Sequence, residues 1–430
     1  MTTPAEQAFL ARILAAPDDD APRLEYADWL ERRGDPRGAF IRAMIALHNL
    51  GVDGDHDERL RLCAIYQPFE RAWTDELCTL LGAPAGTNYF PATFSRGFIE
   101  ALRVPADLLA GMSGVLFSIA PLLRSLSITQ PTNSAFDHAL GEALARRPEL
   151  AQITSIRLFS CDLDDEPVIA FVASPHLAGL RELDLAANKL GPAAVAAVLA
   201  APFAGNLTTL QLWKNKIGDE GAAVIAASAP PGLRHLSLGQ NGIGPHGGLA
   251  LAGSQRLAAV EEIDLGDNPI ADEGVCAIVG STALAGLRRL DVHQVGLGVD
   301  GVRRLAALPG LARIEVLGIG CNDIGDAGLA ALAASPHTGG LVHLDLEGSE
   351  IGDVGMQALA QARDLGRLRE LGLRYNRITN VGAAALAASR CLPGFIDLDL
   401  AYNDIEDEAV LMDRFDHSNL IGQGRRTEIR

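Results

Sequence analysis

The chain has 430 residues, of which 48% are hydrophobic, and carries a formal net charge of -18. The acidic balance, with a pI near 5.0, argues against nucleic acid and anionic membranes as partners, because both attract clustered Lys and Arg. Acidic residues interrupt the N-terminus, and no apolar run approaches the roughly 18 residues of a membrane helix. The six cysteines form no CxxC pair. We therefore expect a cytoplasmic protein with reduced thiols.

The first hundred residues do not repeat, and they begin with a predicted helical hairpin. An aspartate run precedes Ala21 and Pro22, a pattern that favours a helix start, and Gly34 suits the end of that helix. A second helix is expected from Asp35 and Pro36. A network of Asp28, Arg33 and Asp35 and a buried Trp29 are expected to lock the two helices together. The alternative, that these residues form a docking surface, stays open.

Four short sequences carry a resemblance for this segment: YADWL at 26–30, RGDP at 33–36, FIR at 40–42 and FSRGF at 94–98. Together they resemble the bacterial repeat-companion domain, a module found at the N-terminus of proteins with repeat arrays. The resemblance implies a helical module over residues 1–98, followed by an array, and it supplies no catalytic residue. We expect this module also to cover the open end of the array, because terminal repeats need caps, and Trp73, Leu77 and Leu80 lie in the segment placed to do so.

A repeating template fills most of the remaining chain. It has the pattern L-x-x-L-x-L-x-x-N-x-L, as in the stretch from Leu180 to Asn188, and predicts one strand and one helix per copy. Copies recur every 27 residues, except once after 26, and their first apolar residues are Ile153, Leu180, Leu207, Leu233, Val260, Leu287, Ile314, Leu341, Leu368 and Phe395. A degenerate copy from Leu123 and a capping strand over 99–104 extend the array to residues 99–410. Residues 411–430 are a predicted C-terminal tail.

The turn after each strand contains an Asn-type residue whose amide can bond backbone groups. Val295 and Ser349 interrupt this series, so looser turns are expected in those two copies. Beyond the turn, Asp219, Asp326 and Asp353 are predicted to be N-caps of the helices that they begin, because Asp accepts hydrogen bonds from free first-turn amides.

A turn of the form Asn-x-Ile-Gly-Asp-x-Gly followed by a helix is similar to the ribonuclease-inhibitor-like subclass of leucine-rich repeats. The resemblance covers residues 123–410. It implies an α/β solenoid in the shape of a horseshoe, with a parallel sheet on the concave face and helices on the convex face. The subclass includes inhibitors, GTPase-activating proteins and receptor sensor domains, so it does not by itself define a function.

The predicted concave face combines carboxylates with a few aromatic and basic side chains. Strand alternation places on it Asp184, Asp264, Asp291, Asp345 and Asp399, an acidic strip that would steer a partner with a basic surface. The alternative is that these aspartates are solvated and bind no partner. Interface anchors are expected at Phe159 and His293 and in two groups. The first group is Trp213, Lys214 and Lys216, and the second is Arg374, Tyr375, Arg377 and Tyr402, in which the two tyrosines lie in adjacent copies. The alternative is that each ring lies flat over a neighbouring small residue, such as Ala186 or Gly239 beside Trp213.

Catalytic motifs are missing from the sequence. His293 lies near several aspartates, but no spacing of metal ligands supports a metal site. We therefore predict no catalytic residue, no metal and no cofactor. The sequence favours a monomeric, non-enzymatic scaffold that binds a protein on the concave face. The alternative is a regulator of a small GTPase, with Arg374 as the candidate residue.

Overall fold

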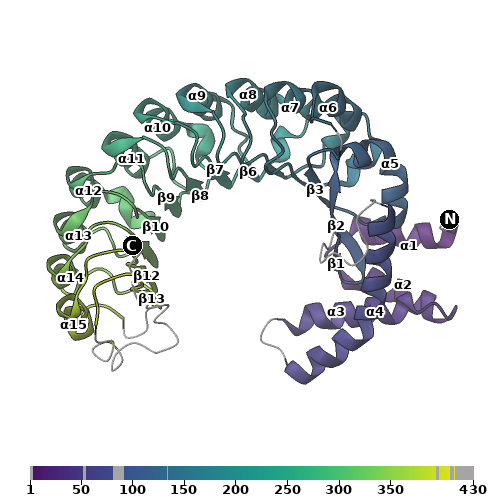
Figure 1. The fold of residues 1–430 in the computed structure, drawn as a ribbon, viewed down its shortest axis with the longest axis horizontal. Coiled ribbons are helices and arrows are strands. Elements are labelled where there is room, and N and C mark those ends of the chain that lie inside the picture. The colour runs from purple at the N-terminus through teal and green to yellow at the C-terminus, as the bar shows by residue number, and fades with distance from the viewer. Residues whose placement is uncertain are drawn as a thin grey trace, which may run out of the picture. The chain divides into compact units, whose positions relative to one another are not determined.

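The computed structural model describes residues 3–51, 55–80, 92–132, 134–393, 397–406 and 411. Two compact units make up the chain, residues 1–183 and 184–430. Thirteen strands form one sheet in the order of the sequence (Figure 1). The predicted repeat architecture of strands and helices is confirmed. Phe395, most of the expected tail at 411–430 and the side chain of Trp73 lie outside the described residues.

The first unit opens with helices, which are α1 (Pro4–Ala15), α2 (Asp20–Glu31), α3 (Arg37–Leu50) and α4 (His56–Leu80). The predicted hairpin corresponds to α2 and α3. Asp19 caps α2 by accepting a hydrogen bond from the Ala21 amide at 2.9 Å. Gly34 lies between the two helices with φ of +72°, a conformation that favours glycine. Helix α1, which begins with a capping box of Thr3 and Glu6, was not predicted.

The helices of the first unit pack on a strand hairpin formed by β1 (Ala92–Ser95) and β2 (Phe98–Pro105), which are antiparallel. Arg23 is 1% exposed, and its guanidinium donates to Glu100 at 2.6 Å and to the Pro17 carbonyl oxygen at 3.0 Å. Gly97 permits close contact, because a Cβ atom there would lie 2.6 Å from the Ile41 Cα atom. The helical segment is thus joined to the start of the sheet by a buried ion pair and by close packing.

The side chain of Trp29 differs from its predicted burial. It is half-buried, and the Arg33 guanidinium carbon lies 4.4 Å from its ring centre. Tyr26, at 2% exposed, is the buried aromatic residue of this helix. Asp28 and Asp35 do form ion pairs, but with other arginines than Arg33: Arg37 binds Asp35 at 2.8 Å, and Arg42 binds Asp28 as well as Glu31. Tyr26 replaces Trp29 in the core because it lies on the face of α2 that meets α1 and β2.

Parallel pairing begins with β2. The next elements of the first unit are α5 (Ala106–Ile119), β3 (Ser125–Thr129), α6 (His138–Ala145), β4 (Ser155–Arg157) and α7 (Asp165–Val172). Leu102 of β2 is in register with Leu126 of β3. Leu126 and Ile128 are buried. Strands therefore lie where the capping strand and the degenerate copy from Leu123 were predicted, whereas the capping role and the domain boundary at residue 98 remain predictions.

The repeats continue with strands of three residues and short helices. The strands are β5 (Glu182–Asp184), β6 (Thr209–Gln211), β7 (His235–Ser237), β8 (Glu262–Asp264), β9 (Arg289–Asp291), β10 (Val316–Gly318), β11 (His343–Asp345), β12 (Glu370–Gly372) and β13 (Asp397–Asp399). The helices are α8 (Pro192–Ala200), α9 (Gly218–Ser228), α10 (Pro245–Ala252), α11 (Ala271–Gly280), α12 (Val299–Ala306), α13 (Gly325–Ala333), α14 (Asp353–Leu359) and α15 (Asn380–Ala388). Short 3-10 helices span Pro148–Gln152, Pro175–Leu177, Ala204–Asn206, Gln255–Leu257 and Pro309–Arg313.

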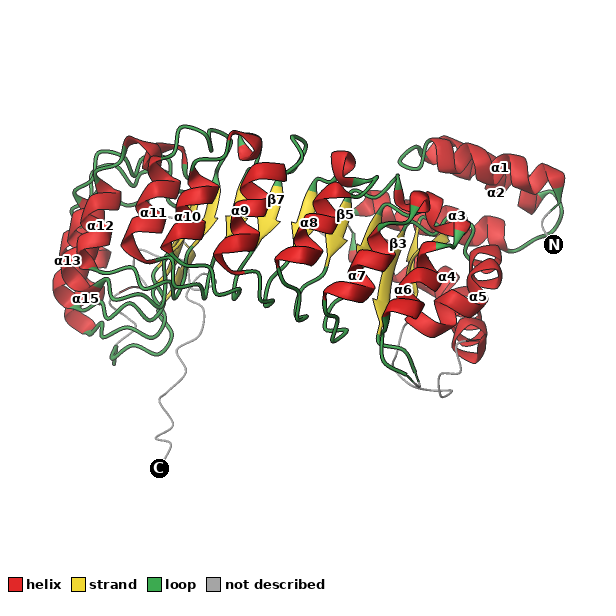
Figure 2. Cartoon of the chain, turned by 90° about the horizontal axis from the view of Figure 1, so that it is seen from above, coloured by secondary structure: helices red, strands yellow, loops and turns green. Residues whose placement is uncertain are grey.

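Within the second unit the strands line the inner side of a curve and the helices its outer side (Figure 1). Figure 2 shows α8 to α11 side by side in one row, with strands behind them. The central leucines of successive strands are in register, as with Leu317, Leu344 and Leu371, and are buried. Equal spacing in the sequence thus becomes equal height in the stack, and the apolar residues form one continuous core between the sheet and the helices.

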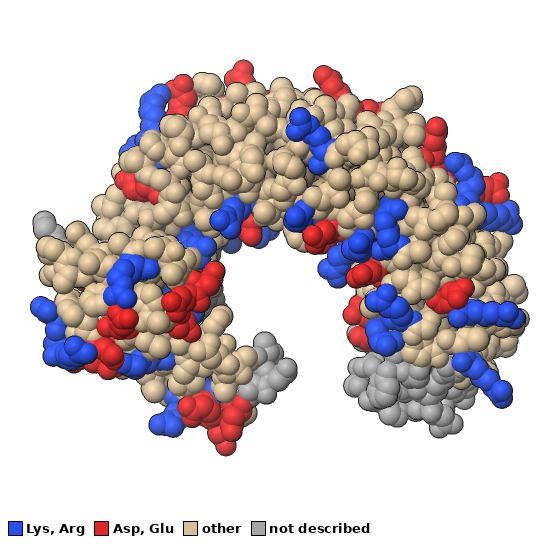
Figure 3. Space-filling view, turned by 180° about the vertical axis from the view of Figure 1, so that it is seen from behind, with Lys and Arg blue, Asp and Glu red and all other residues tan. Residues whose placement is uncertain are grey.

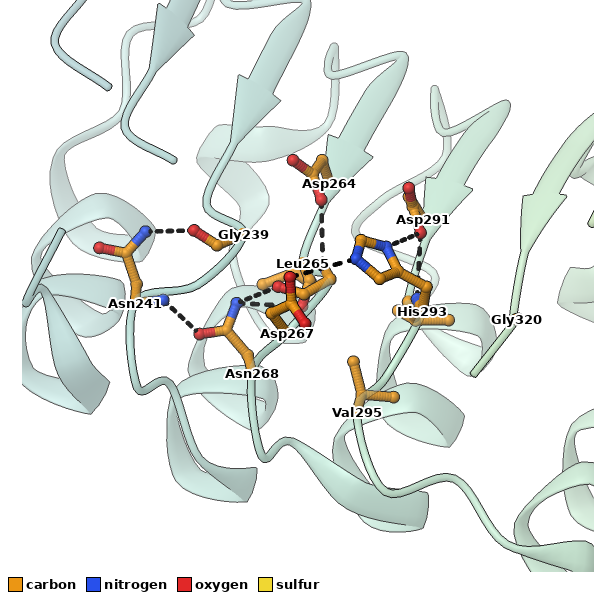
Figure 4. A network of polar contacts seen from close by, with 12 residues as sticks. Gly239, Asn241, Asp264, Leu265, Asp267, Asn268, Asp291, His293, Val295 and Gly320 are labelled. Carbon is orange, nitrogen blue, oxygen red and sulfur yellow. Dashed lines mark hydrogen bonds and ion pairs between the residues drawn. The ribbon is translucent and has the colours of Figure 1, made fainter. Parts of the chain in front are cut away.

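Buried asparagines tie neighbouring repeats together (Figure 4). The Asn268 side-chain amide donates to the carbonyl oxygens of Leu238 at 2.8 Å and Leu265 at 3.0 Å, and its oxygen accepts from the Asn241 amide at 2.9 Å. At Val295 this ladder lacks an amide, and the Ile270 amide in the preceding repeat donates to the Asn268 carbonyl oxygen at 2.8 Å. The interruption therefore changes the bonding of the repeat before it.

The predicted aspartate caps are wrong in one respect, which is the helix that each aspartate caps. Asp219 lies inside the first turn of its own helix, and its carboxylate instead accepts hydrogen bonds from the amides of Gly244 at 2.7 Å and Gly247 at 2.9 Å, at the start of the next helix. Asp326 does the same for Gly352 and Gly355. A Cβ atom at Gly247 would lie 2.6 Å from the Asp219 carboxylate, so the second glycine of the motif makes room for the cap. Each aspartate therefore links two repeats.

Candidate protein-binding surface

The sheet surface of the second unit that faces away from the helices is here called the inner face. Side chains on both sides of each central leucine project to it, because neighbours along a strand point to opposite sides. Of the expected site residues, Phe159 lies in the first unit. The second unit holds Asp184, Trp213, Lys214, Asp264, Asp291, His293, Asp345, Arg374, Tyr375, Asp399 and Tyr402. The register places Asp264 beside Asp291, and Gly372 between Asp345 and Asp399.

Each strand aspartate has a structural role that the sequence did not reveal. The carboxylate accepts a hydrogen bond from the amide two residues further along, at 2.9 to 3.0 Å. The acceptors are Asp184, Asp264, Asp291, Asp345 and Asp399. Such a bond closes the turn where the strand ends, which is a common role of Asp. These residues thus shape the strand ends in addition to charging the face.

Basic side chains interrupt the acidic strip. His235 lies 3.2 Å from Glu262, and Arg374 lies 3.5 Å from Asp399. Gly318 separates Asp291 from Asp345. The side of the molecule drawn in Figure 3, which is not the inner face, also shows Lys and Arg interspersed with Asp and Glu. The expected strip is therefore partly neutralised within the chain, although acidic residues remain in excess on the inner face.

His293 is the centre of one ion-pair cluster (Figure 4). Its ring nitrogens lie 2.9 Å from Asp291 and 3.3 Å from Asp267. The hydrogen bond to Asp291 raises the pKa of His293 to about 9, against the opposing effect of burial. A Cβ atom at Gly266 would lie 2.0 Å from the imidazole, so only glycine leaves room for the ring. His293 is thus a protonated partner of two carboxylates at neutral pH.

Asp264 belongs to the same region and is less exposed than the sequence suggested. It accepts hydrogen bonds from the Ser237 hydroxyl at 2.7 Å and the Gly266 amide at 3.0 Å. Burial raises the pKa of its carboxyl group. Among the described residues no group of three or more His, Cys, Asp or Glu side chains has the geometry to hold a metal ion. This cluster is therefore a network of ion pairs and hydrogen bonds.

The expected aromatic anchors differ in their surroundings. Trp213 is half-buried and lies against Gly239, where a Cβ atom would come within 2.7 Å of the indole ring. The Lys214 ammonium lies 5.6 Å from the indole ring centre. Phe159 is 42% exposed, with the Arg157 guanidinium carbon 4.7 Å from its ring centre. Trp213 thus has the packing of the alternative interpretation, in which the ring covers a small residue.

The tyrosine pair is the most exposed aromatic feature of the inner face. Tyr375 and Tyr402 stack with ring centres 4.3 Å apart and planes 4° apart, and Tyr375 is 51% exposed. The Arg374 guanidinium carbon lies 5.4 Å from the centre of each ring. Arg374 also lines a cavity of about 240 Å³ over β11 to β13. The structure therefore brings together the second group of anchors that the sequence predicted.

A further cavity of about 240 Å³ lies in the first unit, and the sequence did not predict it. Its polar wall consists of Glu6, Tyr26 and Arg37, in which Glu6 accepts from the Tyr26 hydroxyl at 2.7 Å and pairs with Arg37 at 3.1 Å. The rest of the wall is mainly apolar. Because these polar groups already bond to one another, the cavity presents no free charge to a ligand.

Comparisons with known proteins agree with the repeat pattern. The leucine-rich repeat model matches residues 206–226, 231–252, 260–279, 314–333, 341–360, 368–387 and 396–412. The chain therefore contains leucine-rich repeats. No curated protein matches the sequence. None of the described helices is long and apolar enough to span a membrane.

Two solved structures align with this chain at low identity. An internalin from Listeria monocytogenes aligns at 18% identity and a TM-score of 0.33, over 61% of this chain and 85% of the internalin. A chain of the yeast Rad7 and Elc1 complex aligns at 16% identity and a TM-score of 0.46, over 84% of this chain and 89% of that chain.

Proposed function

We propose that this chain is a non-enzymatic scaffold that binds a protein with a basic surface on its inner face. The proposal includes a monomeric, cytoplasmic protein that needs no cofactor. It also assigns the repeats to the ribonuclease-inhibitor-like subclass and residues 1–98 to a repeat-companion module. The helices between successive strands and the 27-residue spacing support the subclass.

The excess of carboxylates on the inner face is the observation that supports this function. Those of the second unit are Asp184, Glu262, Asp264, Asp267, Asp291, Asp345, Glu347, Glu370, Asp397 and Asp399. Lys and Arg at the equivalent positions are Lys214, Arg289 and Arg374. An excess of one sign attracts a partner of the other sign and raises its association rate.

The aromatic anchors would determine how long such a complex lasts. Exposed aromatic and arginine side chains commonly dominate the binding energy of protein interfaces. The Tyr375 and Tyr402 pair meets this description best, because it is exposed and already ordered by stacking. Trp213 is the second candidate, with a smaller expected contribution since it also packs on Gly239.

Native pull-down followed by binding kinetics tests the proposal. With the purified partner, raising the salt concentration should slow association, because screening shortens the range of the attraction. Tyr375→Ala should speed dissociation and weaken binding about thirtyfold, as the loss of roughly 2 kcal/mol implies. Glu220→Gln on the outer helix α9 is the control. Binding that ignores both changes but is lost on altering the outer helices would contradict the proposal.

Arg374 gives no support to the alternative of a GTPase regulator. Such a regulator needs an arginine or asparagine that reaches a nucleotide on the partner. Arg374 lies beside two tyrosine rings and 3.5 Å from Asp399. These contacts favour a local role in ordering the tyrosine pair.

A further inference from the structure

The tyrosine stack ends at a position where the preceding repeat has no side chain. Cys321, Gly348, Tyr375 and Tyr402 occupy equivalent positions in successive repeats. Tyr402 covers one face of Tyr375, with 4.3 Å between ring centres. On the other side stands Gly348, where the three atoms nearest to an added Cβ atom would all belong to Cys321, at 3.4 Å or more, and none to Tyr375. The stack therefore has room for one more planar group on Tyr375.

The space beside the stack is strongly acidic. The neighbouring cavity of about 240 Å³ is lined by Asp345, Glu347, Glu370, Asp397, Asp399 and Arg374. His343 engages Glu370, and Arg374 engages Asp399. Glu347 and Asp397 form no ion pair with any described residue. The surface thus offers an aromatic ring face together with carboxylates that are free to pair.

We propose that this surface binds an arginine side chain of a protein partner, with its guanidinium stacked on Tyr375 at the position left empty by Gly348. A guanidinium is planar, so it stacks on aromatic rings, and its rigid fork of donors pairs with carboxylates. An ammonium group is not planar. Charge complementarity with Glu347, which directly precedes Gly348 in the chain, selects a cation, and the single stacking position selects a flat one. The inference rests on the proposed function and names the chemical group of the partner that is recognised.

Peptide binding to the full chain tests this site without the natural partner. Three short dye-labelled peptides, identical except for arginine, lysine or citrulline at one position, are titrated by fluorescence anisotropy. Citrulline keeps the planar shape of arginine without its charge. The arginine peptide should bind about tenfold more tightly than the lysine peptide. The difference in affinity between the arginine and citrulline peptides should be larger than tenfold.

Matched variants locate the binding. Tyr375→Phe should keep the affinity for the arginine peptide, because the ring remains. Tyr375→Ala should lower it about tenfold. Glu347→Gln should also lower it, and Glu220→Gln on α9 should not. Circular dichroism and thermal melting verify that each variant is folded, which is expected since Tyr375 is exposed.

Four results would overturn the site. The first is that the arginine peptide shows no saturable binding up to about 5 mM, and the second is that it binds no more tightly than the citrulline peptide. The third is that Tyr375→Ala binds the arginine peptide as well as the wild type does. The fourth is that free arginine binds as tightly as the arginine peptide. If the arginine peptide does not bind but a protein partner binds the inner face, the arginine site is wrong and the proposed scaffold function stands. If the peptide binds as expected and no protein partner exists, the proposed scaffold function is wrong.

Discussion

At the scale of single residues, one side chain often determines the bonding of a neighbouring repeat. Asn268 serves the repeats on either side of it, and Gly266 leaves the space that His293 of the next repeat fills. Val295 shows the reverse case. It has no side-chain amide, and the Ile270 backbone amide in the preceding repeat bonds the Asn268 carbonyl oxygen instead. A substitution in this chain should therefore be judged by the contacts of the adjacent repeats as well as its own.

Restoring the amide ladder at residue 295 should stabilise the chain. In Val295→Asn, the new side chain would repeat the contacts of Asn268, donating to the carbonyl oxygens of Leu265 and Val292 and accepting from the Asn268 amide. Three hydrogen bonds of about 1 kcal/mol each would exceed the roughly 2 kcal/mol lost with the buried valine side chain, so the free energy of unfolding in urea should rise by about 1 kcal/mol.

Val292→Asn is the matched control, because it puts the same amide into the apolar core, where no ladder partner exists. It should cost several kcal/mol. Equal destabilisation by the two variants would show that the ladder geometry does not extend through residue 295.

The cluster around His293 predicts a pH dependence of stability. Its pKa is raised to about 9 in the folded chain, from about 6.5 in an unfolded one. A raised pKa means that the stabilisation by protonated His293 is fully present below about pH 6.5 and is lost as the pH rises through about 9. The stability difference between the wild type and His293→Gln should therefore shrink between about pH 6 and pH 10.

Chemical denaturation at several pH values measures this difference. His246→Gln, at an exposed position on α10, is the control and should show no comparable change. A difference for His293→Gln that stays constant across the range would mean that the ion pairs with Asp267 and Asp291 do not stabilise the folded state.

At the scale of elements, each helix depends on the repeat before it. The helices are short, and short isolated helices are marginal in water. The carboxylate of Asp326 satisfies the first free amides of α14 and also carries a negative charge near the start of that helix, which is favourable. This arrangement explains why Gly-Asp-x-Gly recurs as one unit: the aspartate makes the contact and the glycine of the next copy admits it.

Asp326→Ala should lower the stability of α14 more than that of α13, to which Asp326 itself belongs. The loss of a cap costs about 1 to 2 kcal/mol. Hydrogen exchange should show faster exchange of the Gly352 and Gly355 amides, with smaller changes in α13. Asp323→Ala, an exposed carboxylate in the same repeat, is the control. Faster exchange confined to α13 would restore the original prediction that Asp326 caps its own helix.

At the scale of the whole molecule, the repeats need an end cap, and the helical segment is our candidate for it. Arg23 is buried against Glu100 of β2, and Arg96 donates to the Asp18 carbonyl oxygen at 3.1 Å. These contacts tie the loop before α2 to the first strands of the sheet. Losing the helices would leave buried charges without partners as well as exposed apolar surface.

Truncation measures the cap. Removing residues 1–50 should leave a folded but less stable chain, and removing residues 1–104 should cause aggregation, because the apolar edge of β3 would be uncovered. Size-exclusion chromatography with light scattering distinguishes these outcomes. A soluble, monodisperse fragment that begins at Ile153 would show that the array needs no N-terminal cap.

The sequence alone determined the repeat architecture and the residues of the core. Strand alternation and the 27-residue period depend on neighbours along the chain, so Leu317, Leu344 and Leu371 could be placed at the same height of the stack in advance. The same reasoning put Tyr375 next to Tyr402. It also found the α2 and α3 hairpin, since helix starts and stops are marked locally by Asp, Pro and Gly.

Only the tertiary structure decided which polar groups meet across repeats. Asp219 bonds the Gly244 amide, and Asp264 bonds the Ser237 hydroxyl, over separations of 25 and 27 residues. Such contacts depend on how far one layer is offset from the next, and a single sequence does not encode that offset locally. The same holds for the parallel stacking of the Tyr375 and Tyr402 rings, 4.3 Å apart, because the period sets the height of the two residues but not the angles of their side chains.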